Sequence, residues 1–116
     1  MTTEAMAQII HEKAKERGVS FVELQQAVGP ESEGDMMWEW KGNLIVWAGM
    51  SAQFIEALKK ADISVRPTTA FVYLADGQTL QLPLAKRFQA YKTPHWLPMV
   101  INPRTEGKKN GLNLIP

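Results

Sequence analysis

The chain has 116 residues, 45% of them hydrophobic and 22% charged, and this composition predicts one globular domain and excludes a wholly disordered chain. It contains no cysteine, which excludes a disulfide framework, a thiolate zinc site and a cysteine nucleophile. No apolar run reaches the length of a membrane span, and the first residues carry an acid where a signal peptide carries basic residues. The sequence therefore predicts a cytoplasmic protein without a membrane partner.

The net charge of +1 conceals an asymmetry along the chain. Residues 1–65 hold six Lys or Arg against ten Asp or Glu, and residues 66–116 hold seven against two. A basic half on an otherwise acidic chain is a candidate surface for an anion, and ordinary solvated charge is the alternative.

The first predicted element is an amphipathic helix. It begins after Thr2 or Thr3 and continues to Arg17, where Gly18 stops it. Its apolar residues recur at helical spacing and form one stripe, which is typical of a helix that packs against a core.

A second helix is predicted from Phe21 to Val28. Ser20 and Glu23 have the S-x-x-E form of a capping box, in which each side chain satisfies a backbone amide at the start of a helix. Gly29 ends this helix, and the acidic residues 30–35 are predicted to form a loop.

A tryptophan-rich hairpin is expected next, with strands over Met36–Lys41 and Leu44–Ala48. Gly42-Asn43 lies between them, and this pair is typical of a two-residue turn that needs positive φ. The sequence therefore predicts a hairpin with a defined register.

That register gives the hairpin a face rich in tryptophan. It places Trp40 opposite Ile45. It also places Trp38 opposite Trp47, so that Trp38, Trp40 and Trp47 share one face. On the favoured interpretation this face covers the core, because tryptophan buries a large area. On the alternative, the three tryptophans are an exposed platform for stacking bases or for a second subunit.

A third helix and a second hairpin follow. Ser51 is the expected N-cap of a helix that runs to about Ala61. The hairpin has strands over Phe71–Ala75 and Gln78–Leu82, joined by Asp76-Gly77, a pair that favours a type I′ turn. The fold is expected to depend most on this helix and hairpin.

The last predicted strand is Trp96–Ile101, and Pro98 places it at an edge or in a bulge, since proline has no amide to donate. Residues 102–116 are rich in polar residues, glycine and proline and are predicted to be a flexible tail. The expected organisation is thus one domain over residues 1–101 followed by a tail.

No catalytic or metal-binding pattern accompanies these elements. The sequence has no G-x-S-x-G, H-E-x-x-H, phosphate-binding glycine loop or dinucleotide fingerprint. The two histidines, His11 and His95, are isolated from each other and from clustered ligands, and the acids of residues 31–35 lie on an expected loop. We therefore expect a non-enzymatic protein without a cofactor or a metal.

The predicted order of elements is α-α-β-β-α-β-β-β, with the tryptophan-rich hairpin as an insertion, and the fold class is α+β. The passage from Lys15 to Leu24 resembles the step from the first to the second helix of winged-helix domains. Ser51 to Ala61 followed by a hairpin resembles their third helix and wing. This resemblance implies DNA binding, with the third helix in the major groove and the wing against the backbone.

The resemblance also implies which side chains face DNA. Carried over by position, and with the basic residues that follow the wing, they are Ser51, Gln53, Lys59, Lys60, Lys86, Arg87 and Lys92. The leading hypothesis is a non-catalytic DNA-binding accessory or regulatory protein of bacterial type, with a homodimer as one possible state. The alternative is a protein-interaction or dimerisation module that uses an exposed face formed by Trp38, Trp40 and Trp47.

Overall fold

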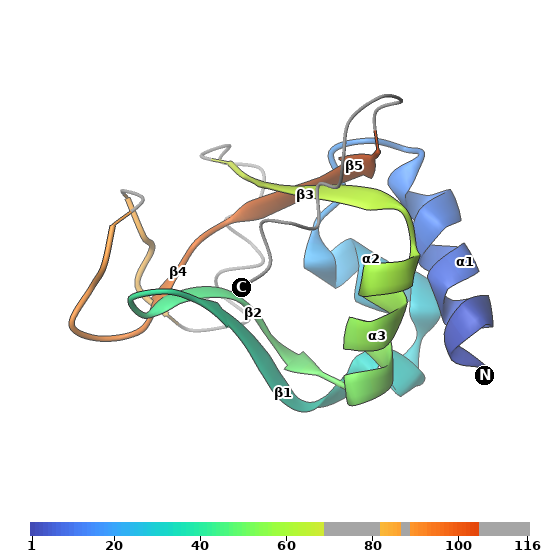
Figure 1. Cartoon of the computed structure of the whole chain (residues 1–116), viewed down its shortest axis with the longest axis horizontal. Helices are drawn as coiled ribbons and strands as arrows, with labels where there is room; N and C mark the ends of the chain where they lie inside the picture. Colours follow the sequence, from blue (N-terminus) through green and yellow to red (C-terminus); the bar gives the residue numbers. More distant parts are fainter. Residues whose placement is uncertain (69–81, 87–88, 105–116) are drawn as a thin grey trace.

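Within the described part of the chain, three helices gather at one end of the molecule and strands extend away from them (Figure 1). The computed structural model describes residues 1–68, 82–86 and 89–104. The elements are, in order, α1 (Thr3–Ala14), α2 (Phe21–Val28), the 3-10 helix η1 (Pro30–Ser32), β1 (Glu33–Trp40), β2 (Leu44–Met50), α3 (Ala52–Lys60), β3 (Ile63–Pro67), β4 (His95–Trp96) and β5 (Met99–Pro103). The protein is a small single α+β domain, which confirms the predicted fold class.

Helix α1 begins where the sequence predicts and ends earlier. The Thr2 side chain accepts a hydrogen bond from the Ala5 amide and caps the helix. Arg17 and Gly18 both adopt a φ of 64°, which a right-handed helix does not tolerate. The helix therefore ends at Ala14 rather than at Arg17.

Helix α2 has the predicted bounds. The Ser20 hydroxyl accepts a hydrogen bond from the Glu23 amide at 3.2 Å, and the Glu23 carboxylate accepts one from the Ser20 amide at 3.1 Å. The capping box is thus complete. Gly29, with a φ of 96°, ends the helix.

The predicted tryptophan-rich hairpin is present as β1 and β2. Trp38 lies opposite Trp47, as predicted, but Trp40 lies opposite Leu44 and not Ile45. The turn holds residues 41–43 rather than two residues, which moves the pairing next to it by one position. A register irregularity after Trp38 then restores the predicted pair.

The prediction of a loop over residues 30–35 is wrong for its second half. Residues 30–32 form η1, and Glu33, Gly34 and Asp35 open strand β1. Gly34 makes this possible, because a Cβ there would lie 2.7 Å from the Cα of Ser51. A side chain would force the two backbones apart.

Strand β3 is an element that the sequence reasoning did not predict. It follows α3 and pairs antiparallel with β5, with Val65 opposite Ile101. Ile101 also forms a bridge with Val19, in the connection between α1 and α2. The second sheet is therefore joined to the helices through its β5 strand.

The predicted strand Trp96–Ile101 is in fact divided between two sheets. Strand β4 pairs parallel with β2 in a sheet of order β1-β2-β4, whereas β5 pairs with β3. Pro98 lies between β4 and β5, where a proline costs no ladder hydrogen bond. Strand β5 continues to Pro103, past the predicted domain boundary at residue 101.

Two predictions concern residues that the structure does not describe. Apart from Leu82, the hairpin predicted over Phe71–Leu82 lies outside the described residues, and so does the tail from residue 105 onward. Both stay predictions.

The core lies between the helices and the sheets. Side chains with no exposed surface come from all three helices and from both sheets, among them Met6, Leu24, Phe54, Met50 and Ile101. No helix in the described ranges is both long and apolar enough to cross a membrane.

Candidate interaction surface

The tryptophans of the hairpin belong to the core. Trp38 and Trp47 are 7% and 2% exposed. Both pack on Phe21, with the Trp47 ring stacked at a centroid distance of 5.9 Å and the Trp38 ring edge-on at 6.1 Å. Trp40 is partly buried against the same core. The core interpretation is therefore supported, and the exposed-platform alternative fails for Trp38 and Trp47 because both are covered.

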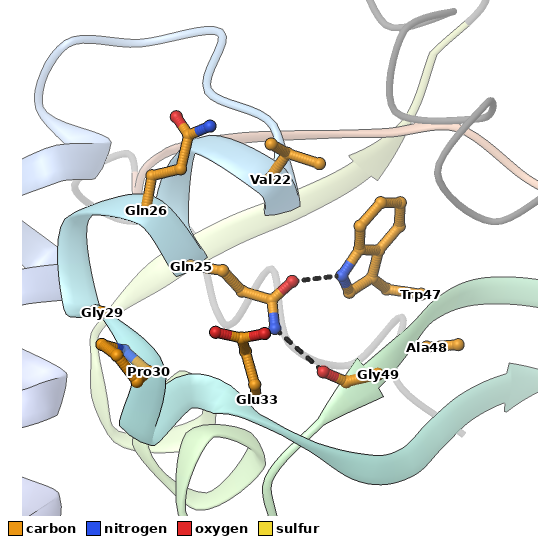
Figure 2. Close-up of a pocket in the computed structure, with 9 residues that line it drawn as sticks. All are labelled: Val22, Gln25, Gln26, Gly29, Pro30, Glu33, Trp47, Ala48 and Gly49. Atoms are coloured by element: carbon orange, nitrogen blue, oxygen red, sulfur yellow. Dashed lines mark hydrogen bonds between the residues drawn. The ribbon is translucent and has the colours of Figure 1, made fainter.

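The side chain of Gln25 connects α2 to the hairpin (Figure 2). Its Oε1 accepts a hydrogen bond from the Trp47 indole Nε1 at 2.8 Å. Its Nε2 donates to the carbonyl oxygens of Ser32 at 3.2 Å and Gly49 at 3.1 Å. One amide thus holds the ends of both strands of the hairpin near α2.

We expect Gln25→Ala to lower the free energy of unfolding by about 1–3 kcal/mol, because it leaves the buried Trp47 indole N–H without its acceptor. Urea denaturation measures the change. Gln26→Ala is the matched control, because Gln26 is exposed and we expect it to change stability by less than about 0.5 kcal/mol. Equal effects of the two substitutions would contradict this role of Gln25.

A groove of about 450 Å³ lies beside Gln25, between α2 and the open end of the hairpin (Figure 2). Among the described residues that line it, Glu33 alone has a titratable side chain. The Gln25 amide is already bonded to Trp47 and to the backbone. Acid–base catalysis needs several convergent groups, and this groove does not bring them together.

Strand β1 forms one edge of its sheet and is exposed along most of its length. Residues 33–37 are all exposed, with Met36 at 47% and Met37 at 51%. Two adjacent half-exposed methionines are an adaptable apolar contact beside the acidic residues of the strand. We call residues 33–39 of β1 the acidic edge.

The acidic edge carries charge that is not neutralised within the described part of the chain. Glu33, Asp35 and Glu39 are exposed, and no ion pair is recorded for them among residues 1–68, 82–86 and 89–104. Four acids elsewhere are instead paired with lysines: Glu16 with Lys13, Glu12 with Lys15, Glu56 with Lys59 and Glu4 with Lys60. The negative potential is therefore expected to be strongest beside β1.

The residues of α3 that the resemblance assigns to DNA are engaged within the protein. The Ser51 hydroxyl accepts a hydrogen bond from the Phe54 amide at 3.0 Å and donates to the Glu31 carbonyl at 2.7 Å. The Gln53 amide donates to the carbonyl of Met1 at 2.7 Å. These bonds occupy two of the side chains that base readout would need.

The two lysines of α3 are half exposed and paired with acids. Lys59 lies 3.7 Å from Glu56, and Lys60 lies 3.1 Å from Glu4. A backbone hydrogen bond and, after it, Lys60 lower the pKa of the Glu4 carboxyl. Both lysines are thus partly neutralised at the face that would meet phosphates.

The described lysines after the predicted wing differ from those of α3 in that they are not paired with acids of the described chain. Lys86 and Lys92 are exposed, and no ion pair is recorded for either among the described residues. Arg87 lies outside the described residues.

Both histidines bond to nearby carbonyl oxygens. His11 Nδ1 lies 2.8 Å from the carbonyl oxygen of Ala61, and His95 Nδ1 lies 2.8 Å from that of Thr93. Within the described ranges no group of three or more His, Cys, Asp or Glu side chains could hold a metal ion. His11 thus links α1 to the end of α3.

The sequence reasoning missed the acidic edge because it treated residues 30–35 as a loop. A signal was present. Glu33, Asp35, Met37 and Glu39 occupy every second position, and Gly34, Met36 and Trp38 lie between them. A two-residue alternation of this kind is typical of a strand with one solvated face.

The fold and the surface together define a small α+β domain with a helical end and an exposed, acidic sheet edge. Comparisons of the chain with protein-family models, curated proteins and solved structures found no match.

Proposed function

We propose that this protein is a non-catalytic protein-interaction module that binds a positively charged partner through the acidic edge. The observation that carries the proposal is the exposure of β1, where three carboxylates without a recorded ion pair in the described chain flank two half-exposed methionines. Exposed apolar side chains next to uncompensated charge are typical of a surface that meets a partner of opposite charge. The contact surface is thus the strand itself and not the tryptophans beneath it.

We expect the triple substitution Glu33→Gln, Asp35→Asn, Glu39→Gln to weaken binding of a short peptide of alternating lysine and valine by about tenfold. Each exposed charge pair contributes about 0.5 kcal/mol, so three of them contribute about 1.5 kcal/mol, close to the roughly 1.4 kcal/mol that corresponds to a factor of ten. Fluorescence anisotropy with a labelled peptide measures the affinity, and circular dichroism checks that the variant is folded.

The matched control is Glu12→Gln, Glu16→Gln, Glu56→Gln, which removes the same charge from exposed positions on α1, the residues after it and α3. We expect this control to change the affinity by less than about twofold, because non-specific attraction between separated exposed charges is screened by salt. If the two triple variants weaken binding equally, the acidic edge is not the contact surface and the proposal is wrong.

A second candidate is DNA binding of the winged-helix type, which Lys86 and Lys92 favour because both are exposed and no ion pair is recorded for them in the described chain. A labelled DNA duplex in the same assay separates the two functions. Binding of the duplex that falls steeply with salt, together with no binding of the peptide, would favour DNA as the partner.

A further inference from the structure

We propose that the partner contributes a basic, extended segment that adds to the outer side of β1 as a new strand. The inference rests on the proposed function above and specifies its mode of binding. It has three supports: an open hydrogen-bonding edge, apolar side chains on both faces of that edge, and a charge pattern that selects a basic strand.

Among the described residues, nothing pairs with the outer side of β1. In the sheet of order β1-β2-β4, β2 pairs with one side of β1, and β1 is the terminal strand (Figure 1). No backbone hydrogen bond between residues 33–39 and another described segment is recorded beyond the ladder with β2. The outward amides and carbonyls of such an edge are a template for a further strand.

Only the second half of β1 is free of extra residues. Register irregularities occur at three places in the pairing with β2: between Glu33 and Met36 the extra residues lie on β1, whereas between Met36 and Trp38 and between Trp38 and Glu39 the extra residue lies on β2. An added strand therefore pairs with residues 36–39, and the acids at 33 and 35 lie beyond the paired region. They are placed to attract the basic segment rather than to pair with its backbone.

The two methionines can contact the side chains on both faces of an added strand. Met36 and Trp38 lie on one face of β1 by the two-residue alternation, and Met37 and Glu39 lie on the other. Both methionine side chains are about half exposed. Because methionine is flexible and polarisable, it can cover the side chains of a neighbouring strand without a fixed shape.

The charge pattern disfavours a second copy of this chain and favours a basic segment. An antiparallel pair of two β1 strands centred on Met36 would place Glu33 opposite Glu39 at both ends. Like charges directly opposite each other destabilise a pair of strands, whereas opposite charges stabilise it. Edge acids of this kind prevent self-association and still permit a strand that carries lysine or arginine.

The test compares the lysine–valine peptide with the same peptide methylated at its backbone amides, using the unmodified protein. Methylation keeps the charges and side chains and removes the donors, so we expect at least a tenfold loss of affinity. Hydrogen exchange followed by nuclear magnetic resonance is the second readout. The unmethylated peptide should slow exchange of backbone amides within residues 36–39 at least tenfold, and should not change exchange of the Gln26 backbone amide in α2.

Each outcome has a distinct meaning. Equal affinity of the two peptides, or binding without slower exchange in residues 36–39, would overturn strand addition and leave the acidic edge as a surface for charged side chains. No binding of either peptide would overturn both the strand addition and the proposed function. Because the protein is the same in every arm, misfolding of a variant does not enter the comparison.

Discussion

Trp47→Ala is expected to lower the free energy of unfolding by about 3–5 kcal/mol, the range for removal of a buried aromatic side chain. Trp47 is 2% exposed, stacks on Phe21 and donates a hydrogen bond to Gln25. Its removal leaves a cavity between α2 and the hairpin and an unpaired amide oxygen. Since domains of this size are stable by only about 5–15 kcal/mol, the loss is a large part of the total.

Urea denaturation measures the free energy of unfolding of Trp47→Ala and of a control, Met37→Ala. Met37 is a half-exposed residue on the same hairpin. Met37→Ala should cost less than about 0.5 kcal/mol. A Trp47→Phe variant should fall between them, because it keeps a ring beside Phe21 and loses the bond to Gln25. If Trp47→Ala were as stable as the wild type and lost only the ability to bind a partner, the core interpretation of the tryptophans would be wrong.

The second large effect is expected at the hairpin turn, where Gly42→Ala should cost about 2–5 kcal/mol. Gly42 has a φ of 69°, which costs a non-glycine residue about 1–2 kcal/mol. An added Cβ would also lie 2.7 Å from the Cα and Cβ of Ala90, a collision of the kind that costs about 1–3 kcal/mol. The two costs add because their causes differ.

The collision matters because the turn is the attachment point of the segment that leads to β4. The Gly42 carbonyl accepts a hydrogen bond from the Tyr91 amide at 2.8 Å, and the Asn43 side chain donates to the Tyr91 carbonyl at 2.9 Å. The Asn43 carbonyl accepts a bond from the His95 amide at 2.8 Å. A shift at Gly42 therefore strains the contacts that hold β4 beside β2.

Gly49→Ala is the matched control for this prediction. Gly49 has a φ of 72°, close to that of Gly42, but nothing lies within 4 Å of an added Cβ. Its substitution should lower the free energy of unfolding only by the cost of a positive φ at a non-glycine residue, about 1–2 kcal/mol. Thermal denaturation of both variants isolates the collision as the difference. If the two variants were equally destabilised, close packing against Ala90 would not contribute.

The candidate site was only partly predictable from the chain. The sequence correctly indicates that the tryptophans cover the core, because their size makes burial the favoured state. The DNA-facing residues follow only from a resemblance in element order, and such a resemblance carries no information on the tertiary bonds of Ser51 and Gln53. The acidic edge was missed, because whether the backbone at Glu33 is a loop or a strand depends on its pairing with Met50.

Local signals in the sequence determined the start of α1, both ends of α2, the N-cap of α3 and the existence of the first hairpin. Each of these depends on side chains within a few residues of the feature, such as Ser20 with Glu23, and so is encoded by neighbours along the chain. The tertiary structure alone decided the remainder: the pairing of β3 with β5, the division at Pro98 and the exposed side of β1. These features join residues far apart in the chain, and only the packing of the whole domain selects among such pairings.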